Sequence, residues 1–125
     1  MNHNMKKEVK FKFESLIIWQ KSMNFGEQLN QIANQFPKYE KYNLSNQIRR
    51  AGDSIALNIA EGSIGQSKAE FKKFMSYSIR SLAEVITCLY KAQRRNYITQ
   101  DEFNTEYDFA YHLMNMMIGF KEKIK

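Results

Sequence analysis

Apolar residues recur at alternating spacings of four and three along most of the chain, and this spacing constrains the fold more than any other feature. Residues at such a spacing share one face of an α-helix. The first series stops near Pro37, which is disfavoured in a helix interior and also restricts the residue before it. We therefore predict a first helix over residues 14–35. Its buried face holds Ile18, Ser22, Phe25, Leu29, Ile32 and Phe36, and a second stripe holds Leu16, Trp19, Met23, Gly26 and Ala33.

Three further helices are predicted from signals at their ends. Ser45 is a favourable N-cap, and Gly62 suits the left-handed position that ends many helices, so the second helix is expected between them. Two capping boxes, Ser67 with Glu70 and Thr99 with Glu102, predict the starts of the third and fourth helices. The third helix keeps its apolar period to about residue 96, and the fourth ends in a basic last turn.

Residues that interrupt helices are rare in this chain. One Pro and five Gly among 125 residues favour a few long helices over a β fold with many turns. Two of the three predicted connections are short, so neighbouring helices should be antiparallel. The predicted fold is all-α, an antiparallel up-down-up-down four-helix bundle over residues 13–125. Residues 1–12 are predicted to be a mobile basic arm.

The second helix has an unusual mixture of small and polar residues. On a helical wheel, one face collects Ile48, Ala51, Gly52, Ile55 and Ile59 as the predicted core face. A polar stripe borders that face, and Leu57 stands alone on a side that should face solvent. The stripe is either solvated, or buried against another helix or subunit, in which case Leu57 packs into a neighbour. The wheel leaves both interpretations open. The stripe holds Gln47, Ser54, Asn58 and Glu61, with Arg50 at its edge.

Three segments carry a family resemblance: FESLIIWQKS, FPKYEKYNLSNQIRRAGDSIALNIAEG and SKAEFKKFMSYSIRSLAEV. They resemble the four-helix bundle protein family that includes proteins encoded in intervening sequences of bacterial large-subunit ribosomal RNA genes. The resemblance covers residues 13–98 and, more loosely, the last helix. The chain departs from the family pattern at Gly52-Asp53, at Ala56 and at Arg80, and Asp53 could pair with Arg49 four residues earlier.

This resemblance implies a homopentameric barrel with a central channel, and no enzymatic activity follows from it. Related accessory proteins of diversity-generating retroelements bind nucleic acid and a partner reverse transcriptase through a basic surface. A protein-interaction scaffold, or an accessory subunit of such a partner, is therefore the alternative to nucleic-acid binding. We interpret the signature residues as determinants of packing and assembly: Gln47, Ser54, Leu57, Asn58, Glu61, Gly62 and Glu84.

No catalytic, metal or cofactor site is predicted. A di-iron bundle needs a Glu-x-x-His motif on each of two helices. The two histidines, His3 and His112, do not form such motifs. Cys88 is the single cysteine, which excludes an intramolecular disulfide, and a lone buried thiol is expected. Glu61 and Glu84 would form a carboxylate pair only if the bundle brought them together. We therefore expect the protein not to be an enzyme.

Net charge is +6 and the isoelectric point is near 9.4, which suggests an acidic partner unless the charge serves solubility alone. In an antiparallel bundle, ten lysines and five acids gather at one end, which we call the basic end. Such a surface suits phosphates with little sequence readout. Arg49 and Arg50 are ambiguous between interface pairing and nucleic-acid contact. The predicted nucleic-acid-binding residues are Lys10, Lys12, Arg49, Arg50, Lys68, Lys72, Lys73 and Lys121.

The first residues, MNHNMKKEVKFKF, lack the apolar run of a signal peptide. No apolar segment approaches the roughly 20 residues of a membrane helix. A cytoplasmic location is therefore expected.

Overall fold

A computed structural model describes residues 8–125, which form four α-helices and two short 3-10 helices. The described residues contain no strand, so the predicted all-α class is confirmed. The 3-10 helices are η1, Lys12–Ser15, and η2, Lys38–Glu40. The α-helices are α1, Ile17–Ala33, α2, Leu44–Ser63, α3, Lys68–Arg94, and α4, Gln100–Glu122.

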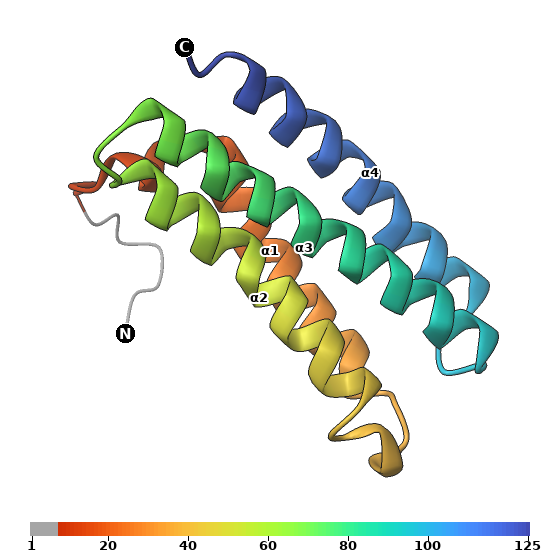
Figure 1. Cartoon of the computed structure of the whole chain (residues 1–125). Helices are drawn as coiled ribbons and strands as arrows, with labels where there is room; N and C mark the ends of the chain where they lie inside the picture. The colour runs from red at the N-terminus through yellow and green to blue at the C-terminus, as the bar shows by residue number, and fades with distance from the viewer. Residues whose placement is uncertain (1–7) are drawn as a thin grey trace.

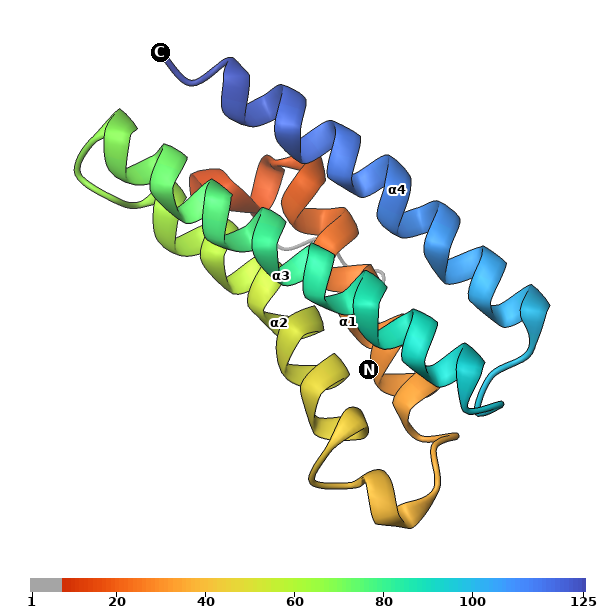
Figure 2. The ribbon, with the colours of Figure 1, turned by 45° about the vertical axis from the view of Figure 1, so that its right-hand side comes forward.

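Each helix packs against the next one in the chain, and α4 also packs against α1. Successive helices run in opposite directions (Figure 1). The α1–α2 and α3–α4 connections therefore lie toward one end, whereas the α2–α3 connection and the C-terminus lie toward the other. Figure 2 shows α2 and α4 on opposite sides of α3, and no backbone contact joins this diagonal pair in the described part of the chain.

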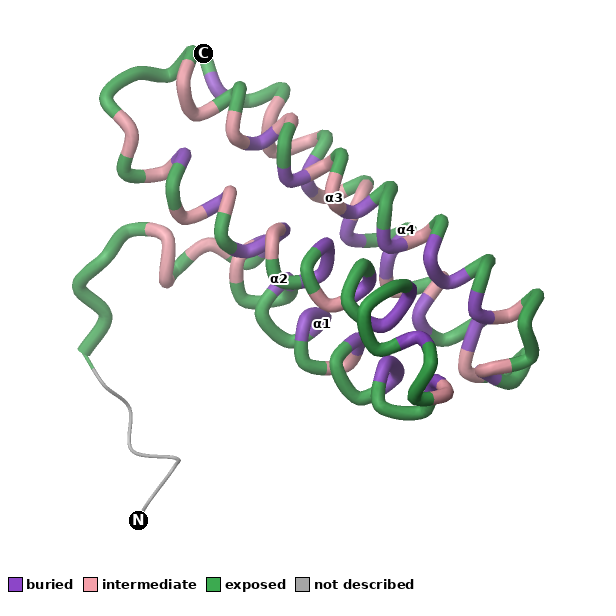
Figure 3. Tube along the Cα trace, turned by 60° about the horizontal axis from the view of Figure 1, so that its bottom comes forward, coloured by how far each residue is buried: buried purple, intermediate pink, exposed green. Residues whose placement is uncertain are grey.

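The core is a single cluster that all four helices contribute to. Buried positions recur along each helix, on the sides that face the other helices (Figure 3). The first predicted series is buried throughout, including Ser22, whose hydroxyl donates to the carbonyl of Ile18 at 2.6 Å. The predicted core face of the second helix is also confirmed, since Ile48, Ile55 and Ile59 are fully buried.

Two predicted helix starts are wrong by a few residues. Leu16 has an extended backbone (φ −76°, ψ 123°), which separates η1 from α1, so α1 begins at Ile17. The second helix begins at Leu44, with Asn43 rather than Ser45 as its N-cap. The helix starts earlier because a side chain outside it caps its first residue. The carboxylate of Glu40 accepts the Leu44 backbone N–H at 3.3 Å.

The capping boxes are confirmed to different degrees. At Thr99 both bonds form, since Glu102 N donates to Thr99 Oγ1 at 3.1 Å and Thr99 N donates to Glu102 Oε1 at 2.8 Å. At Ser67 only the first bond forms, from Glu70 N at 3.0 Å. The Glu70 carboxylate instead accepts the backbone N–H of Gln66 at 3.1 Å, which caps the preceding turn.

Gly62 has a different role from the predicted one. Among the described glycines none has a positive φ, and α2 continues through Gly62 to Ser63. A Cβ on Gly62 would lie 2.8 Å from the Cβ of Phe74 and 2.9 Å from Cδ1 of Phe71. Glycine is therefore needed here because α3 passes close to α2, and the left-handed residue after a helix is Asn96 instead (φ 62°).

Gly62→Ala should therefore destabilise the fold by about 1–3 kcal/mol through overpacking. Gly119→Ala is the matched control, because an added Cβ there meets nothing within 4 Å. That control should gain about 0.5–1 kcal/mol from helix propensity. Urea unfolding monitored by circular dichroism measures both, and a Gly62 variant as stable as the Gly119 variant would contradict the close-packing explanation.

Candidate functional site

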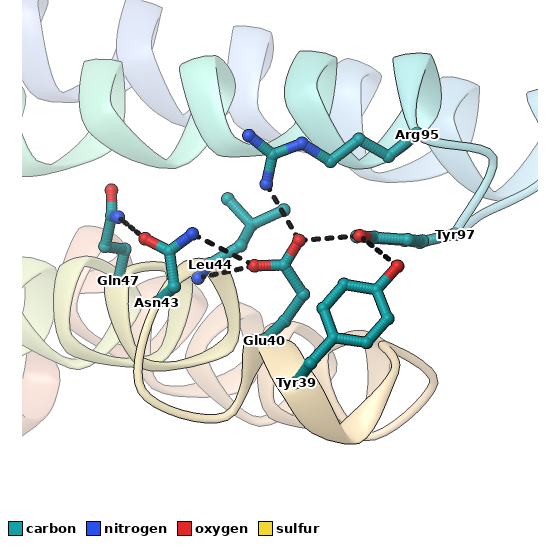
Figure 4. Close-up of polar contacts among 7 residues, drawn as sticks. All are labelled: Tyr39, Glu40, Asn43, Leu44, Gln47, Arg95 and Tyr97. Carbon is teal, nitrogen blue, oxygen red and sulfur yellow. Dashed lines mark hydrogen bonds and ion pairs between the residues drawn. The ribbon is translucent and has the colours of Figure 1, made fainter.

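Glu40 is buried and is the centre of a polar network at the end where the α1–α2 and α3–α4 connections meet (Figure 4). Its Oε1 accepts from Asn43 Nδ2 at 3.1 Å, in addition to the Leu44 N–H. Its Oε2 accepts from Arg95 Nη1 at 2.9 Å and from the Tyr97 hydroxyl at 2.6 Å. Glu40 therefore ties the first connection to the third, across more than 50 residues of chain.

The network stabilises the charged form of Glu40. The Tyr97 hydroxyl, the Leu44 N–H and Arg95 together outweigh burial and lower the pKa of the Glu40 carboxyl. The Glu40 carboxylate also raises the pKa of Tyr97 and has the largest effect on it. The next largest effect comes from the Tyr39 hydroxyl, whose oxygen lies 3.1 Å from the Tyr97 oxygen. Arg95–Glu40 is the one ion pair that residues 8–125 contain. Both carboxylate oxygens of Glu40 accept hydrogen bonds, so the network joins the two connections.

Part of the predicted polar stripe on α2 is an inter-helix network. The hydroxyls of Ser54 and Ser81 lie 2.8 Å apart and join α2 to α3. Asn58 Nδ2 donates to both the carbonyl and the hydroxyl of Ser54, each at 2.8 Å. All three residues are half-buried, so the buried interpretation holds for Ser54 and Asn58 within one protomer.

The rest of the stripe is exposed. Gln47 donates to Asn43 Oδ1 at 2.9 Å, and Glu61 and Glu84 face solvent. The Ser54–Ser81 contact places Glu61 level with about residue 74 of the antiparallel α3. At 1.5 Å per residue, Glu84 then lies about 15 Å farther along the helix. The two carboxylates therefore do not form a pair.

Arg49 and Arg50 differ in their surroundings. Arg49 donates from Nε to Asn30 Oδ1 at 2.8 Å and from Nη2 to Asn34 Oδ1 at 2.6 Å. It thus joins α2 to α1, and it makes no ion pair with Asp53 within the part of the chain that is described. Arg50 is exposed. Within the protomer Arg49 contacts α1 and the residue after it, and a contact of Arg49 or Arg50 with another subunit or with nucleic acid stays a prediction.

An apolar hollow of about 430 Å³ lies between α1 and α2. Leu57 is at its rim with 61% of its surface exposed. The small residues Gly26, Gly52, Ala56 and Ala60 line the hollow, so the same short side chains that allow close packing also leave this space. The larger apolar lining residues are Phe13, Trp19, Met23 and Leu57, and Ser22, Glu27 and Asp53 also line the hollow.

The predicted binding lysines are exposed at the basic end, except Lys121, which is half-buried. Lys68, Lys72 and Lys73 occupy the first two turns of α3, whereas Lys10 and Lys12 lie at or just before η1. The start of α1, the α2–α3 connection and the end of α4 lie toward the same end in Figure 1. Lys6 and Lys7 lie outside the described residues.

The structure adds a basic and aromatic strip along α3 that sequence reasoning missed. Lys73 Nζ lies 6.0 Å from the ring centre of Phe74, and Phe74 and Tyr77 contact edge to face with centroids 5.5 Å apart. The Arg80 guanidinium lies 5.9 Å from the Tyr77 ring centre. We call Lys73, Phe74, Tyr77 and Arg80 the α3 strip. Its signal in the sequence was the interleaving of cations and aromatics at helical spacing.

Cys88 and His112 are two further side chains of types that can support catalysis or metal binding. Burial raises the pKa of the Cys88 thiol to about 11, so it is protonated at neutral pH. His112 is exposed, and His3 lies outside the described residues. Within residues 8–125 no three His, Cys, Asp or Glu side chains are arranged to hold a metal ion. In the same range, no helix is long and apolar enough to span a bilayer.

Comparison with known proteins identifies a family match. The sequence model described as 23S rRNA-intervening sequence protein matches residues 14–119. A crystal structure of a protein of unknown function from the S23 ribosomal protein family of Bacteroides thetaiotaomicron is similar, with a TM-score of 0.80 and 22% identity. The likeness covers 86% of this chain and 100% of that one, and at this identity it supports the fold alone. No curated protein matches the chain significantly.

Tyr97→Phe should destabilise the protein at pH 7, because it removes the largest influence that lowers the Glu40 pKa. A carboxyl with a lowered folded pKa contributes stability above its unfolded pKa and loses it as pH falls through the folded pKa. The melting temperature should therefore drop by several degrees at pH 7, and the deficit should shrink as the pH falls toward 2.

Tyr42→Phe is the control, since Tyr42 belongs to the same connection but is 85% exposed. Thermal melts across that pH range distinguish the two variants. Equal melting temperatures at pH 7 would rule out a stabilising role for the Tyr97–Glu40 bond.

Proposed function

Because the chain belongs to the 23S rRNA-intervening sequence protein family, we propose that it is a non-enzymatic, homo-oligomeric protein of the cytoplasm. It binds RNA or DNA through its basic end, with little sequence specificity. The observation that carries this proposal is the group of exposed lysines where α3 begins, Lys68, Lys72 and Lys73.

These lysines are available for phosphate contacts. Glu70, the acid nearest to them in sequence, uses its carboxylate to cap the α2–α3 connection. Within the described range the only ion pair is at the opposite end, between Arg95 and Glu40. Cations that are not paired within the protein can release counterions from a nucleic-acid backbone, which produces affinity that falls steeply with salt.

The α3 strip supports a nucleic acid with accessible bases. Tyr77 is 37% exposed and lies between Phe74 and Arg80. Aromatic rings and guanidinium planes stack on bases of any sequence, while neighbouring cations follow the phosphate backbone. The strip begins at Lys73, so it continues from the basic end along the same helix.

The apolar hollow supports the homo-oligomeric part of the proposal. An exposed apolar face next to small residues is suited to a second helix. A second copy placed against Leu57 would cover that side chain and the hollow together. The family resemblance favours a pentamer, in which the basic end would be repeated five times around an axis.

The same hollow also favours the second candidate function, a scaffold or accessory subunit for another protein such as a reverse transcriptase. The two functions differ in their response to salt. Phosphate contacts weaken as salt rises, whereas an apolar interface persists. Co-purification of one protein partner at high salt, with no nucleic-acid binding at low salt, would favour the scaffold.

Replacing Lys68, Lys72 and Lys73 together with Glu should abolish binding to a mixed-sequence RNA at low salt. The matched control replaces Lys38, Lys41 and Lys91 with Glu, because these exposed lysines give the same charge change at the opposite end. The control should keep most of its affinity in a gel-shift titration. Unchanged binding by the first variant, or equal losses in both, would refute the proposed surface.

Leu57→Asp should dissociate the oligomer without unfolding the protomer, since the Leu57 side chain is already exposed there. Light scattering should report a multiple of the 14.8 kDa protomer for the unmodified protein and a smaller mass for the variant. Ile118→Asp, on α4, is the control for an added charge at another exposed apolar position. A protomer mass for the unmodified protein would overturn the assembly proposal.

A further inference from the structure

Glu106 is the most anomalous buried group of the chain. It lies in the second turn of α4 with only 8% of its surface exposed. Its Oε1 is the one buried side-chain oxygen or nitrogen in residues 8–125 that has no hydrogen-bond partner. Buried acceptors without partners are rare in native proteins, because they lose the hydrogen bonds of water without replacement.

Glu106 lines a hollow of about 350 Å³ between the end of α1 and the start of α4. On the α1 side the polar lining consists of Gln28, Gln31 and Gln35. On the α4 side, Asp101 and Glu102 accompany Glu106. The lining contains no Lys, Arg or His, so nothing in it balances the acidic side chains.

Neighbouring charges increase this imbalance. Glu102 is held in its charged form by the Thr99 N–H, which lowers its pKa. Burial and the adjacent Glu102 both raise the pKa of Glu106. A positive charge within the hollow would relieve both effects, since it would pair with Glu106 and offset the repulsion from Glu102.

The lining also indicates the class of cation. Ca²⁺ and Mg²⁺ need several oxygen ligands at about 2.0–2.6 Å from the ion. Among the described residues, no cluster of three or more His, Cys, Asp or Glu side chains could provide them. Acceptors that are spread over a hollow instead suit N–H donors that radiate from a nitrogen cation. Ile32, which is buried, lines the same hollow and offers an apolar wall for a methylene chain.

We propose that this hollow is a binding site for an alkylammonium or guanidinium group that donates an N–H to the Glu106 carboxylate and packs its stem on Ile32. The amide oxygens of Gln28, Gln31 and Gln35 complete the acceptors. The group belongs either to a free polyamine or to a Lys or Arg side chain of a protein. This site is separate from the basic end and does not depend on nucleic-acid binding.

The test is a titration of the full-length, ¹⁵N-labelled protein with spermidine and, separately, with a short Arg- and Lys-containing peptide. The side-chain amide signals of Gln28, Gln31 and Gln35 are followed by NMR. We expect saturable shifts with at least one probe, and at least a tenfold weaker affinity for Glu106→Gln. Asp108→Asn, which removes the same charge from an exposed position of α4, should change the affinity by less than about twofold.

Saturation by spermidine alone identifies a free polyamine as the source of the cation, and saturation by the peptide alone identifies a basic side chain. A melting temperature that rises with the probe in the unmodified protein, but not in Glu106→Gln, provides a second measurement. Absence of saturation with both probes, or equal affinities of the unmodified protein and Glu106→Gln, would overturn the proposal.

Discussion

The close contact between α2 and α3 is the interaction on which the rest of the structure depends. Ser78 of α3 donates its buried hydroxyl to the carbonyl of Ile55 at 2.6 Å, and Ser54 meets Ser81 one turn away. Gly62 allows Phe71 and Phe74 to approach the end of α2. Short side chains thus replace apolar area with backbone proximity on the side of α2 that faces α3, which explains the presence of Ser54 and Gly62 there.

Small side chains also determine the shape of the outer face of α2. Small residues on its α1 side leave an apolar hollow, and Leu57 remains exposed at the rim. Arg49 donates to Asn30 of α1 and to Asn34 directly after that helix, so α2 is attached to α1 partly through polar contacts. The side of α2 that faces α3 is closely packed, whereas Leu57 on another side is exposed. That exposed side is the surface of α2 that a second subunit could contact.

The acidic residues at the start of α4 and the exposed lysines at the start of α3 lie at opposite ends of the bundle. The end with the α1–α2 and α3–α4 connections contains the Glu40 network and, nearby in the chain, Asp101, Glu102 and Glu106. The other end holds the exposed lysines at the start of α3. Successive antiparallel helices produce this division, because the acidic start of α4 and the basic start of α3 are placed at opposite ends (Figure 1). The two candidate binding sites are therefore suited to ligands of opposite charge.

The sequence by itself determined the helices, their buried faces and the clustering of charge, because these depend on spacing within a few residues. It misassigned Ser45 because the Glu40 side chain, four residues before Leu44, caps the start of α2, and it misassigned Gly62 because the phenylalanines of α3 pack against that residue. Only the tertiary structure decided which residues Glu40 and Arg49 bond, and that Glu106 Oε1 has no hydrogen-bond partner among the described residues. Glu40 meets Arg95 across 55 positions, and a pairing at that separation depends on how the helices pack, which no local periodicity encodes.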